Sequence, residues 1–314
     1  MAKSNADISI VIPVYNSEET LEPLCEQIKA VMERDNRPFE LILVNDGSSD
    51  SSWEKIQALV QAHEFVRGIN LMRNYGQHNA LLCGLREAKS EITLTMDDDL
   101  QHPPEEIHLL LEKLDQGYDV VYGTPKVEQH GLFRDVASIV TKIALRSVMN
   151  VESARHVSAF RAFRTDLRDA FANFQGSTVS IDVLLSWGTT RFAHIKVEHH
   201  ERAAGTSHYT FRKLLQHTMN MLTGYSTLPL RISSAVGFIL TVFGILILLY
   251  AVIRFLIQGG VVPGFTFLAS VIAIFSGAQL FALGIMGEYL ARMHFRLMDK
   301  PSYAIKSKTA HDER

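Results

Sequence analysis

Two long runs without charged residues near the carboxyl end constrain this chain more than any other feature. The first run, residues 232–253, is closed by Arg254, and the second, residues 265–287, contains only Gln279 as a strongly polar residue. Because a helix rises 1.5 Å per residue, the first run spans about 33 Å, which is enough for the core of a bilayer. Each run could also be a buried core helix, but two in succession favour membrane spans.

Basic residues lie on the outer sides of these two runs. Arg212, Lys213 and Arg231 precede the first run, the tail after the second contains five basic residues between 292 and 308, and the connecting loop contains none beyond Arg254. The positive-inside rule therefore predicts two transmembrane helices with both chain termini in the cytoplasm.

The composition of the 314 residues excludes other classes. With 31 basic and 34 acidic residues the net charge is −3, so nothing suggests nucleic-acid binding. Cys25 and Cys83 are too far apart for a CxxC pair and are expected to be reduced core residues. The start of the chain, MAKSNADISIVIPVYN, lacks the features of a signal peptide.

Before the apolar runs, strand-like and helix-like segments alternate. Strand patterns with their following turns occupy 8–15, 40–50, 65–76 and 91–96. Helical patterns occupy 18–34 and 77–88, and between them Ser52 could cap another helix that continues through Val60. This alternation predicts an α/β fold with a mostly parallel sheet and helices on both faces. Residues 132–148 and 211–222 are amphipathic and fit either core helices or helices on a membrane surface.

Polar residues follow each of the four predicted strands. They occupy 13–16, 45–48, 73–76 and 97–99. Sheets of this type bind ligands at the carboxyl ends of their strands, so we expect these segments to form one site.

Three consecutive carboxylates, Asp97 to Asp99, end the fourth predicted strand. On an extended segment Asp97 and Asp99 point the same way, and with the amide of Gln101 they form a set of hard oxygen ligands suited to Mg²⁺ or Mn²⁺. A magnesium ion that keeps few carboxylates completes its shell with water and phosphate oxygens, so a diphosphate is the expected partner. A solvated acidic turn is the alternative.

Other residues at these ends have two interpretations each. Asp46 could accept a hydrogen bond from a nucleotide base or form an Asx-turn that caps the next helix. Tyr15 could stack on the base or be a half-buried aromatic residue at a strand end. His78 and His102 lack neighbours at zinc-ligand spacing, so zinc is disfavoured.

The ordered motifs together resemble glycosyltransferases of family 2 with a GT-A fold, which is Rossmann-like. The resemblance is strongest to the membrane-bound branch that acts on polyprenyl phosphates, including bacterial undecaprenyl-phosphate transferases and dolichol-phosphate mannose synthases. It is carried by VIPVYNSEETL, VNDGSSD, RNYGQHNAL, MDDDLQHPPEEI, VEHHERAAGTSHYTF, TLPLR and GIMGEYLARM, and it covers nearly the whole chain.

The resemblance implies roles for single residues. The nucleotide would contact Pro13, Tyr15, Glu18, Asp46 and Asp98, and the metal would be held by Asp97, Asp99 and Gln101. Arg161 would face the phosphates, and the acceptor phosphate would contact Arg202, Ser207 and Tyr209. The catalytic residues implied in this way are Asp97, Asp99, Arg161 and Arg202.

The chain departs from the family pattern at three positions. Ser17 stands where a carboxylate is common, His208 replaces a lysine, and Ala159 stands where many relatives have an aspartate. The last departure removes a candidate general base. An acceptor phosphate with a second pKa of about 6 is already largely ionised at neutral pH, so it needs positioning and charge stabilisation rather than a base.

The resulting expectation is inverting transfer of one sugar from a nucleotide-sugar, a UDP-sugar, to undecaprenyl or another polyprenyl phosphate in a bacterial inner membrane. Two alternatives remain: a family 2 enzyme or synthase with a sugar acceptor, although no Q-x-x-R-W motif is present, and a catalytically degenerate membrane partner. The resemblance also suggests a homo-oligomer. The expected domains are a GT-A domain over 1–210, a juxtamembrane helix over 211–231, two transmembrane helices over 232–290 and a cytoplasmic tail over 291–314.

Overall fold

The structure is a computed structural model that describes residues 7–126, 156–176, 179–199, 223–258, 264–298 and 300–310. It divides into two compact units. The α/β unit comprises residues 1–218 together with 299–314, and the helical unit comprises residues 219–298. The predicted amphipathic segments 132–148 and 211–222 lie outside the described residues.

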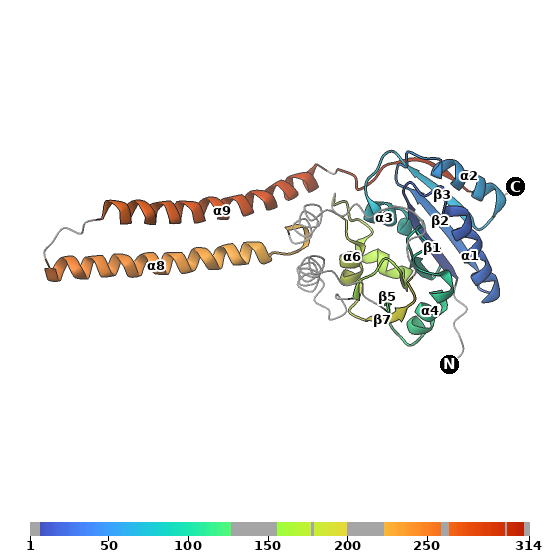
Figure 1. Ribbon diagram of the computed structural model, residues 1–314, viewed down its shortest axis with the longest axis horizontal. Coiled ribbons are helices and arrows are strands. Elements are labelled where there is room, and N and C mark those ends of the chain that lie inside the picture. The colour runs from blue at the N-terminus through green and yellow to red at the C-terminus, as the bar shows by residue number, and fades with distance from the viewer. Residues whose placement is uncertain are drawn as a thin grey trace. The chain divides into compact units, whose positions relative to one another are not determined.

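The α/β unit is built on one eight-stranded sheet with the strand order β7-β5-β6-β4-β1-β2-β3-β8. Figure 1 labels β1, β2, β3, β5 and β7 of this sheet. Parallel pairs join β1 to β2 and β4, β2 to β3, and β5 to β7, whereas β6 and β8 run antiparallel to their neighbours. The predicted mostly parallel sheet is therefore confirmed. The strands are β1 (Ile8–Val14), β2 (Phe39–Asn45), β3 (Val66–Leu71), β4 (Ile92–Thr95), β5 (Val120–Pro125), β6 (Arg161–Arg164), β7 (Phe192–Val197) and β8 (Ile305–Thr309).

Helices cover both faces of the sheet because successive side chains of a buried strand point to opposite sides. The alternate residues Ile8, Ile10 and Ile12 share one core with α1, α2 and α4. On the other face α3 packs so closely that a Cβ on Gly84 would lie 2.3 Å from Val11 Cγ1. The helices of this unit are α1 (Leu21–Arg34), α2 (Ser52–Ala62), α3 (Gln77–Glu87), η1 (Pro104–Glu106), α4 (Ile107–Asp115), η3 (Thr165–Phe171) and α6 (Ile181–Gly188).

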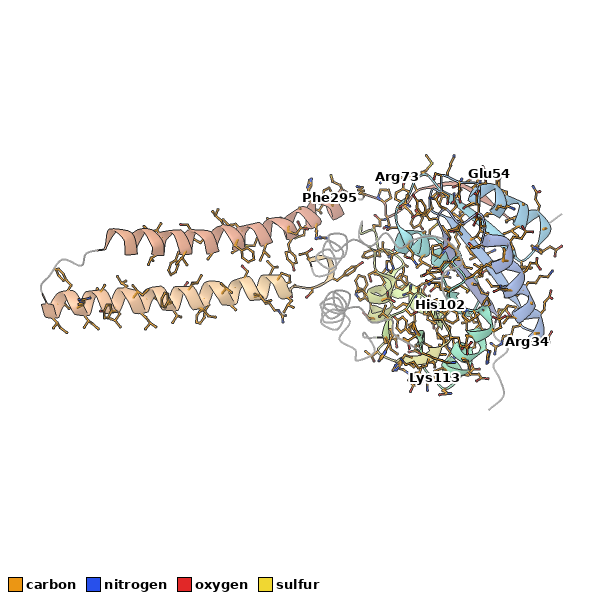
Figure 2. The ribbon with its side chains drawn as sticks, viewed as in Figure 1. Arg34, Glu54, Arg73, His102, Lys113 and Phe295 are labelled. Carbon is orange, nitrogen blue, oxygen red and sulfur yellow. The ribbon has the colours of Figure 1, made fainter. Side chains whose placement is uncertain are left out.

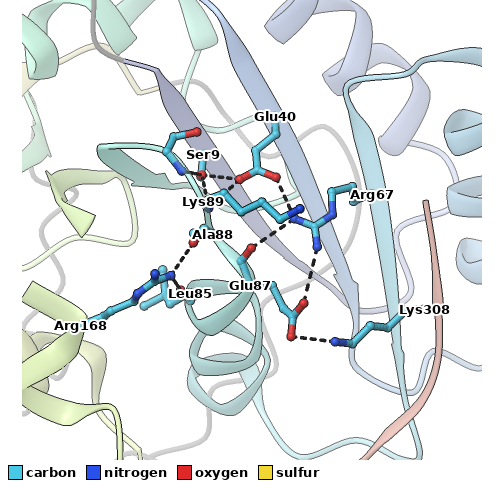
Figure 3. A network of polar contacts seen from close by, with 10 residues as sticks. Ser9, Glu40, Arg67, Leu85, Glu87, Ala88, Lys89, Arg168 and Lys308 are labelled. Carbon is cyan, nitrogen blue, oxygen red and sulfur yellow. Dashed lines mark hydrogen bonds and ion pairs between the residues drawn. The ribbon is translucent and has the colours of Figure 1, made fainter. Parts of the chain in front are cut away.

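The segment after the apolar helices returns to this sheet as β8. Within the predicted cytoplasmic tail, residues 291–314, the segment Ile305–Thr309 pairs antiparallel with β3 at the sheet edge. The Lys308 Nζ lies 2.7 Å from Glu87 Oε1 at the end of α3, and Figure 3 shows how Glu87 joins this pair to a larger polar network. A strand at the edge of a sheet pairs through its backbone, whatever its side chains are. The polar segment IKSKT can therefore form a strand although it lacks the alternating apolar pattern by which strands are predicted.

The same network holds the edge of the sheet where β1, β2 and β3 begin (Figure 3). Glu40 accepts hydrogen bonds from Ser9 Oγ at 2.6 Å, from the Lys89 backbone at 2.8 Å and from Arg67 Nη1 at 2.8 Å. Burial acts to raise the pKa of Glu40, but these bonds outweigh it and the pKa is lowered. These contacts hold the edge of the sheet where the strands begin, and the loops of the candidate site emerge at the opposite edge.

The helical unit consists of α8 (Leu228–Gln258) and α9 (Phe265–Leu297). Segments within each, Leu228–Ile257 and Ile274–Phe295, are long and apolar enough to cross a membrane. Large apolar side chains project outward along both helices (Figure 2), and Phe238, for example, is 71% exposed. The reading of these runs as buried core helices is therefore wrong for the described residues, because such side chains would need an apolar partner in water.

Candidate active site

Four loops meet at the carboxyl-terminal edge of the central strands. β1, β2, β3 and β4 are parallel neighbours, so the loops that follow Val14, Asn45, Leu71 and Thr95 emerge at the same edge. These loops contain the four polar segments that the sequence pattern placed at strand ends. The predicted convergence is what the topology requires, because parallel strands present the same end to the same edge.

The loops after β1 and β2 are joined by side chain–backbone hydrogen bonds. Asn16, at a positive φ of 54°, donates its backbone N–H to Ser48 Oγ at 3.0 Å and accepts the Ser49 N–H on Oδ1 at 2.8 Å. Glu18 accepts the Ser51 N–H on Oε2 at 2.9 Å. Glu18, predicted to bind nucleotide, therefore holds the start of α2. The predicted cap Ser52 is instead the first residue of that helix, and its hydroxyl donates to Asp50 Oδ1 at 2.6 Å.

Asp46 connects the β2 and β3 loops. Its carboxylate accepts the backbone N–H groups of Tyr75 at 2.7 Å and Gly76 at 2.8 Å, and the residue is 2% exposed. Burial raises the pKa of Asp46, and the two amide bonds offset part of that shift. Asp46 therefore holds the loop that leads into α3, a role that neither of its two sequence interpretations described.

Gly47 allows these two loops to approach each other. Its φ is +66°, and a Cβ at this position would lie 2.5 Å from the carbonyl carbon of Arg73 and 2.5 Å from the Asn74 nitrogen. Only glycine combines this backbone conformation with so little space.

The three consecutive carboxylates have different partners. Asp98 turns toward the β1 loop, where its Oδ2 accepts the Ser17 hydroxyl at 2.5 Å and the Tyr15 N–H at 3.2 Å. Burial raises the pKa of Asp98, and the Ser17 hydrogen bond opposes the shift. Asp97 accepts Gln77 Nε2 on Oδ1 at 2.5 Å, and Asp99 accepts the Gln101 backbone N–H on Oδ1 at 3.1 Å.

The Asp97–Asp99 segment is less extended than its strand pattern predicts. The chain bends from Asp98 to Leu100, and Leu100 has a positive φ of 60°. A left-handed residue reverses the local chain direction, so strict alternation of side chains ends at Asp98. The separation of Asp98 from Asp97 and Asp99 therefore arises from hydrogen bonding to the β1 loop rather than from strand pleating.

The donor set at this point fits a hard divalent cation. Within the described residues no three His, Cys, Asp or Glu side chains come together in a way that could hold a metal. Asp97, Asp99 and Gln101 are half-buried at the loop and offer two carboxylates and an amide oxygen. Such a small set suits Mg²⁺ or Mn²⁺, which retain water and phosphate ligands, better than a closed structural site.

His102 follows this loop and is buried. Its ring stacks on Phe160 at a centroid distance of 5.2 Å and lies 4.9 Å from the ring of His199. Burial lowers the pKa of His102 to about 4, with a further contribution from His199. A neutral aromatic ring therefore packs the loop after β4 against Phe160, the residue before β6. Figure 2 labels His102 within the α/β unit.

Arg161 differs most from its prediction. It was expected to face phosphates, but its side chain lies inside the α/β unit, is 1% exposed and is ion-paired with Asp182 on α6. Its Nε donates to Thr95 Oγ1 at 2.9 Å, and Tyr122 donates to Asp182 Oδ1 at 3.0 Å. Burial acts to lower the pKa of Arg161, but the pairing with Asp182 outweighs it and the pKa is raised.

Several predicted residues remain to be placed. Pro13 is buried within β1, whereas the ring of Tyr15 is 50% exposed at the strand end. Arg202, Ser207 and Tyr209, the predicted acceptor-phosphate residues, lie outside the described residues. Gln77 and Asp182 were not among the predicted site residues, although Gln77 lies in the RNYGQHNAL motif.

Comparisons with known proteins give consistent results. The family described as Glycosyl transferase family 2 matches residues 9–171. The undecaprenyl-phosphate 4-deoxy-4-formamido-L-arabinose transferase of Photorhabdus laumondii is 36% identical over 302 residues, covering 95% of this chain and 93% of that protein. The protein of the same name from Shewanella sediminis is also 36% identical, covering 95% and 91%.

A solved structure supports the fold. It is glucosyl-3-phosphoglycerate synthase from Mycobacterium tuberculosis in complex with Mn²⁺, UDP-glucose and phosphoglyceric acid. It has a TM-score of 0.53 and 18% identity, and the match covers 71% of this chain and 79% of that one. At this identity the likeness establishes the GT-A-like fold of the α/β unit.

Proposed function

Because this chain belongs to glycosyl transferase family 2, we propose that it transfers one sugar from a nucleotide-sugar to a polyprenyl phosphate at a membrane. The observation that carries the proposal is the convergence of four strand-end loops on Asp97 and Asp99, in a chain that also has two long exposed apolar helices. The relatives named above support the acceptor, since their names state an undecaprenyl phosphate.

We infer that the nucleotide lies across the β1 and β2 loops. In this proposal the half-exposed Tyr15 stacks on a base. Asp46 acts by holding the Tyr75 and Gly76 backbone, and Asp98 acts by holding the Tyr15 N–H and the Ser17 hydroxyl. Pro13 and Glu18 support the same loops from β1 and from the start of α2. The donor is a UDP-sugar in this proposal.

Asp97, Asp99 and Gln101 would hold Mg²⁺ or Mn²⁺ together with the diphosphate. When bound, the cation supplies Lewis-acid stabilisation of the charge that develops on the leaving nucleoside diphosphate. The hydrogen bond from Gln77 holds one oxygen of Asp97. The Asp97 side chain therefore has fewer rotamers to lose when the donor binds.

The acceptor phosphate needs no proton removed before it attacks. One of its oxygens forms the new bond to the anomeric carbon while the bond from that carbon to the diphosphate breaks, so a single displacement inverts the configuration. Ala159 offers no carboxylate that could serve as a general base, which is consistent with this base-free step. Arg202, Ser207 and Tyr209 are proposed to position the phosphate, and Arg161 is proposed to act from within the fold rather than by contact.

The chain path supports the predicted membrane topology. The α/β unit contains residues before α8 and residues after α9, so both ends of the helix pair connect to the same unit. If both helices cross a bilayer, both ends must then lie on one side of it. The basic residues on those flanks favour the cytoplasmic side of a bacterial inner membrane.

The two alternative functions are not favoured. The relatives are named as undecaprenyl-phosphate transferases rather than synthases with a sugar acceptor, and they match the chain nearly end to end. A degenerate partner would have no reason to retain Asp97, Asp99 and Gln101 beside ordered nucleotide loops.

The test is Asp99→Asn in the full chain, with Asp166→Asn on the exposed surface of η3 as the matched control. Release of UDP from a panel of UDP-sugars is measured with short polyprenyl phosphate and Mg²⁺ or Mn²⁺, and Mn²⁺ binding is measured separately by electron paramagnetic resonance. Loss of a cation contribution of several kcal/mol predicts at least about a 100-fold fall in turnover for Asp99→Asn. Full activity in that variant would contradict the proposal.

A further inference from the structure

Three large apolar side chains of the α/β unit are exposed among its described residues: Tyr15, Met72 and Trp187. Tyr15 belongs to the proposed nucleotide site. Met72 is 60% exposed and Trp187 is 51% exposed, and the proposed reaction uses neither. A tryptophan in water leaves a large apolar surface hydrated, so its exposure calls for a partner.

Both side chains lie where the chain returns from α9. The Met72 backbone N–H donates to the carbonyl of Ala304 at 2.9 Å. Trp187, on the last turn of α6, meets Phe174 edge-on at a centroid distance of 5.7 Å. Two residues beyond Phe174, the carbonyl of Gly176 accepts the Ser302 hydroxyl at 2.9 Å.

Gly176 allows the aromatic pair to lie against the returning segment. A Cβ at this position would be 2.5 Å from Phe174 Cζ, so the ring packs directly over the glycine backbone. Met72 therefore lies beside Ala304, and Gly176, which packs under Phe174, lies beside Ser302, while Trp187 lies against Phe174. Met72, Phe174 and Trp187 are called here the return patch. These residues come from three separate parts of the sequence, which is why no sequence pattern revealed them.

We propose that the return patch contacts the lipid bilayer, with the indole of Trp187 at the level of the headgroups. The inference rests on the proposed function in one respect, that α8 and α9 are membrane spans. Residues 302–304 follow the end of α9 at Leu297 within a few residues, so the patch is continuous along the chain with a lipid-exposed helix. Tryptophan is the residue most typical of that interface, because one end of the ring is apolar and the other can hydrogen-bond to water.

The charges around the patch are mixed. Arg73 and Lys300 are exposed beside it, whereas η3 contributes exposed Asp166 and Asp169 close to α6. Burial of apolar surface rather than attraction to anionic lipid is therefore the expected source of binding. Met72 also begins the loop that Asp46 holds, so the patch adjoins the proposed nucleotide site through that loop.

Tryptophan fluorescence tests this directly, because the chain contains two tryptophans. In Trp53→Phe, Trp187 is the only tryptophan and can be excited selectively. The full chain is placed in nanodiscs of zwitterionic lipid brominated at known depths. The expected result is strong quenching by bromine near the headgroups, weaker quenching by deep bromine, and protection from aqueous acrylamide. The matched variant Trp187→Phe retains Trp53, which packs partly buried against the core and should not be quenched by bromine.

A second probe reports on Met72. Burial raises the thiol pKa values of Cys25 and Cys83 to about 12, so Met72→Cys can be labelled selectively with an environment-sensitive dye. A blue shift of the dye in nanodiscs is expected. Unquenched Trp187 that stays accessible to acrylamide would overturn the proposal, and so would protection from acrylamide without bromine quenching, which would indicate a protein partner.

Quenching requires no turnover. An active protein without quenching would therefore reject the patch alone, and quenching in a protein that never releases UDP would reject the proposed function alone.

Discussion

Replacing Asp182 by asparagine tests how Arg161 acts. The two side chains form an ion pair that is almost fully buried, with 1% exposure for Arg161 and 4% for Asp182. Thr95 and Tyr122 complete the hydrogen bonds of the pair. In Asp182→Asn the guanidinium stays buried beside a neutral amide, while the shape of the site hardly changes.

The expected loss of unfolding free energy is large, because a buried charge without its partner remains poorly solvated. Breaking one side of a buried ion pair typically costs about 3–5 kcal/mol of unfolding free energy. For a unit of this size that corresponds to a fall in Tm of roughly 10 °C. Replacing both partners with apolar residues of similar volume is often nearly neutral or stabilising. The informative comparison is therefore Arg161→Met with Asp182→Leu, with Tyr122→Phe added so that no hydroxyl is stranded.

The assay is thermal unfolding of the full chain in detergent, followed by intrinsic fluorescence, together with UDP release under saturating donor. We expect Asp182→Asn to unfold early and the triple variant to recover most of the lost Tm and to retain turnover. The control is Lys126→Met, which removes an exposed ion pair with Glu198 at 3.4 Å and should change stability by about 0–1 kcal/mol.

Two results would refute this reasoning. A wild-type Tm in Asp182→Asn would show that the guanidinium is not held in the interior by this carboxylate. A triple variant with recovered Tm but no turnover would show that Arg161 reaches the substrate, as the sequence resemblance first implied.

Three further predictions concern the loops and the far edge of the sheet. Gly47→Ala should destabilise the α/β unit by about 1–2 kcal/mol and raise the KM for the donor, because the φ of Gly47 is +66° and Arg73 is too close for a Cβ. The control is Gly237→Ala, where a Cβ would have no atom within 4 Å. Equal Tm values for the two variants would contradict the argument. The pKa of Glu40 is lowered on folding, so the stability that its carboxylate contributes is present above the unfolded pKa near 4.5 and is lost as pH falls through the folded pKa. Glu40→Gln should therefore flatten the acid side of a Tm–pH profile, and an unchanged slope would refute this. Ending the chain after Met298 removes β8 and exposes the edge of β3, so size-exclusion chromatography should detect aggregation, and a monodisperse profile would count against the role of β8.

Local patterns predicted the repeating parts of this fold. The buried strands, the helices between them and the two apolar helices each carry their periodicity or composition within one segment, so they can be identified without a partner. Parallel connection then places the strand ends at one edge, which is why the site region was predictable from the order of the elements alone.

The partners of single polar groups were not predictable in this way. Asp46 holds amides 29 and 30 residues away, and Asp98 holds a hydroxyl 81 residues away. The sequence marks these residues as polar groups at strand ends, but each could equally contact solvent, a ligand or a distant backbone. Only packing decides, because a buried carboxylate must find hydrogen-bond donors wherever the fold supplies them.

The sequence by itself determined the family, the α/β sheet and two helices apolar enough for a membrane. The tertiary structure alone decided that Arg161 lies inside the fold, that IKSKT becomes an edge strand, and that Met72 lies beside Ala304 and Trp187 against Phe174. The physical reason is one of range: periodicity and propensity act over a few neighbouring residues, whereas burial, ion pairing and edge pairing depend on residues that only folding brings together.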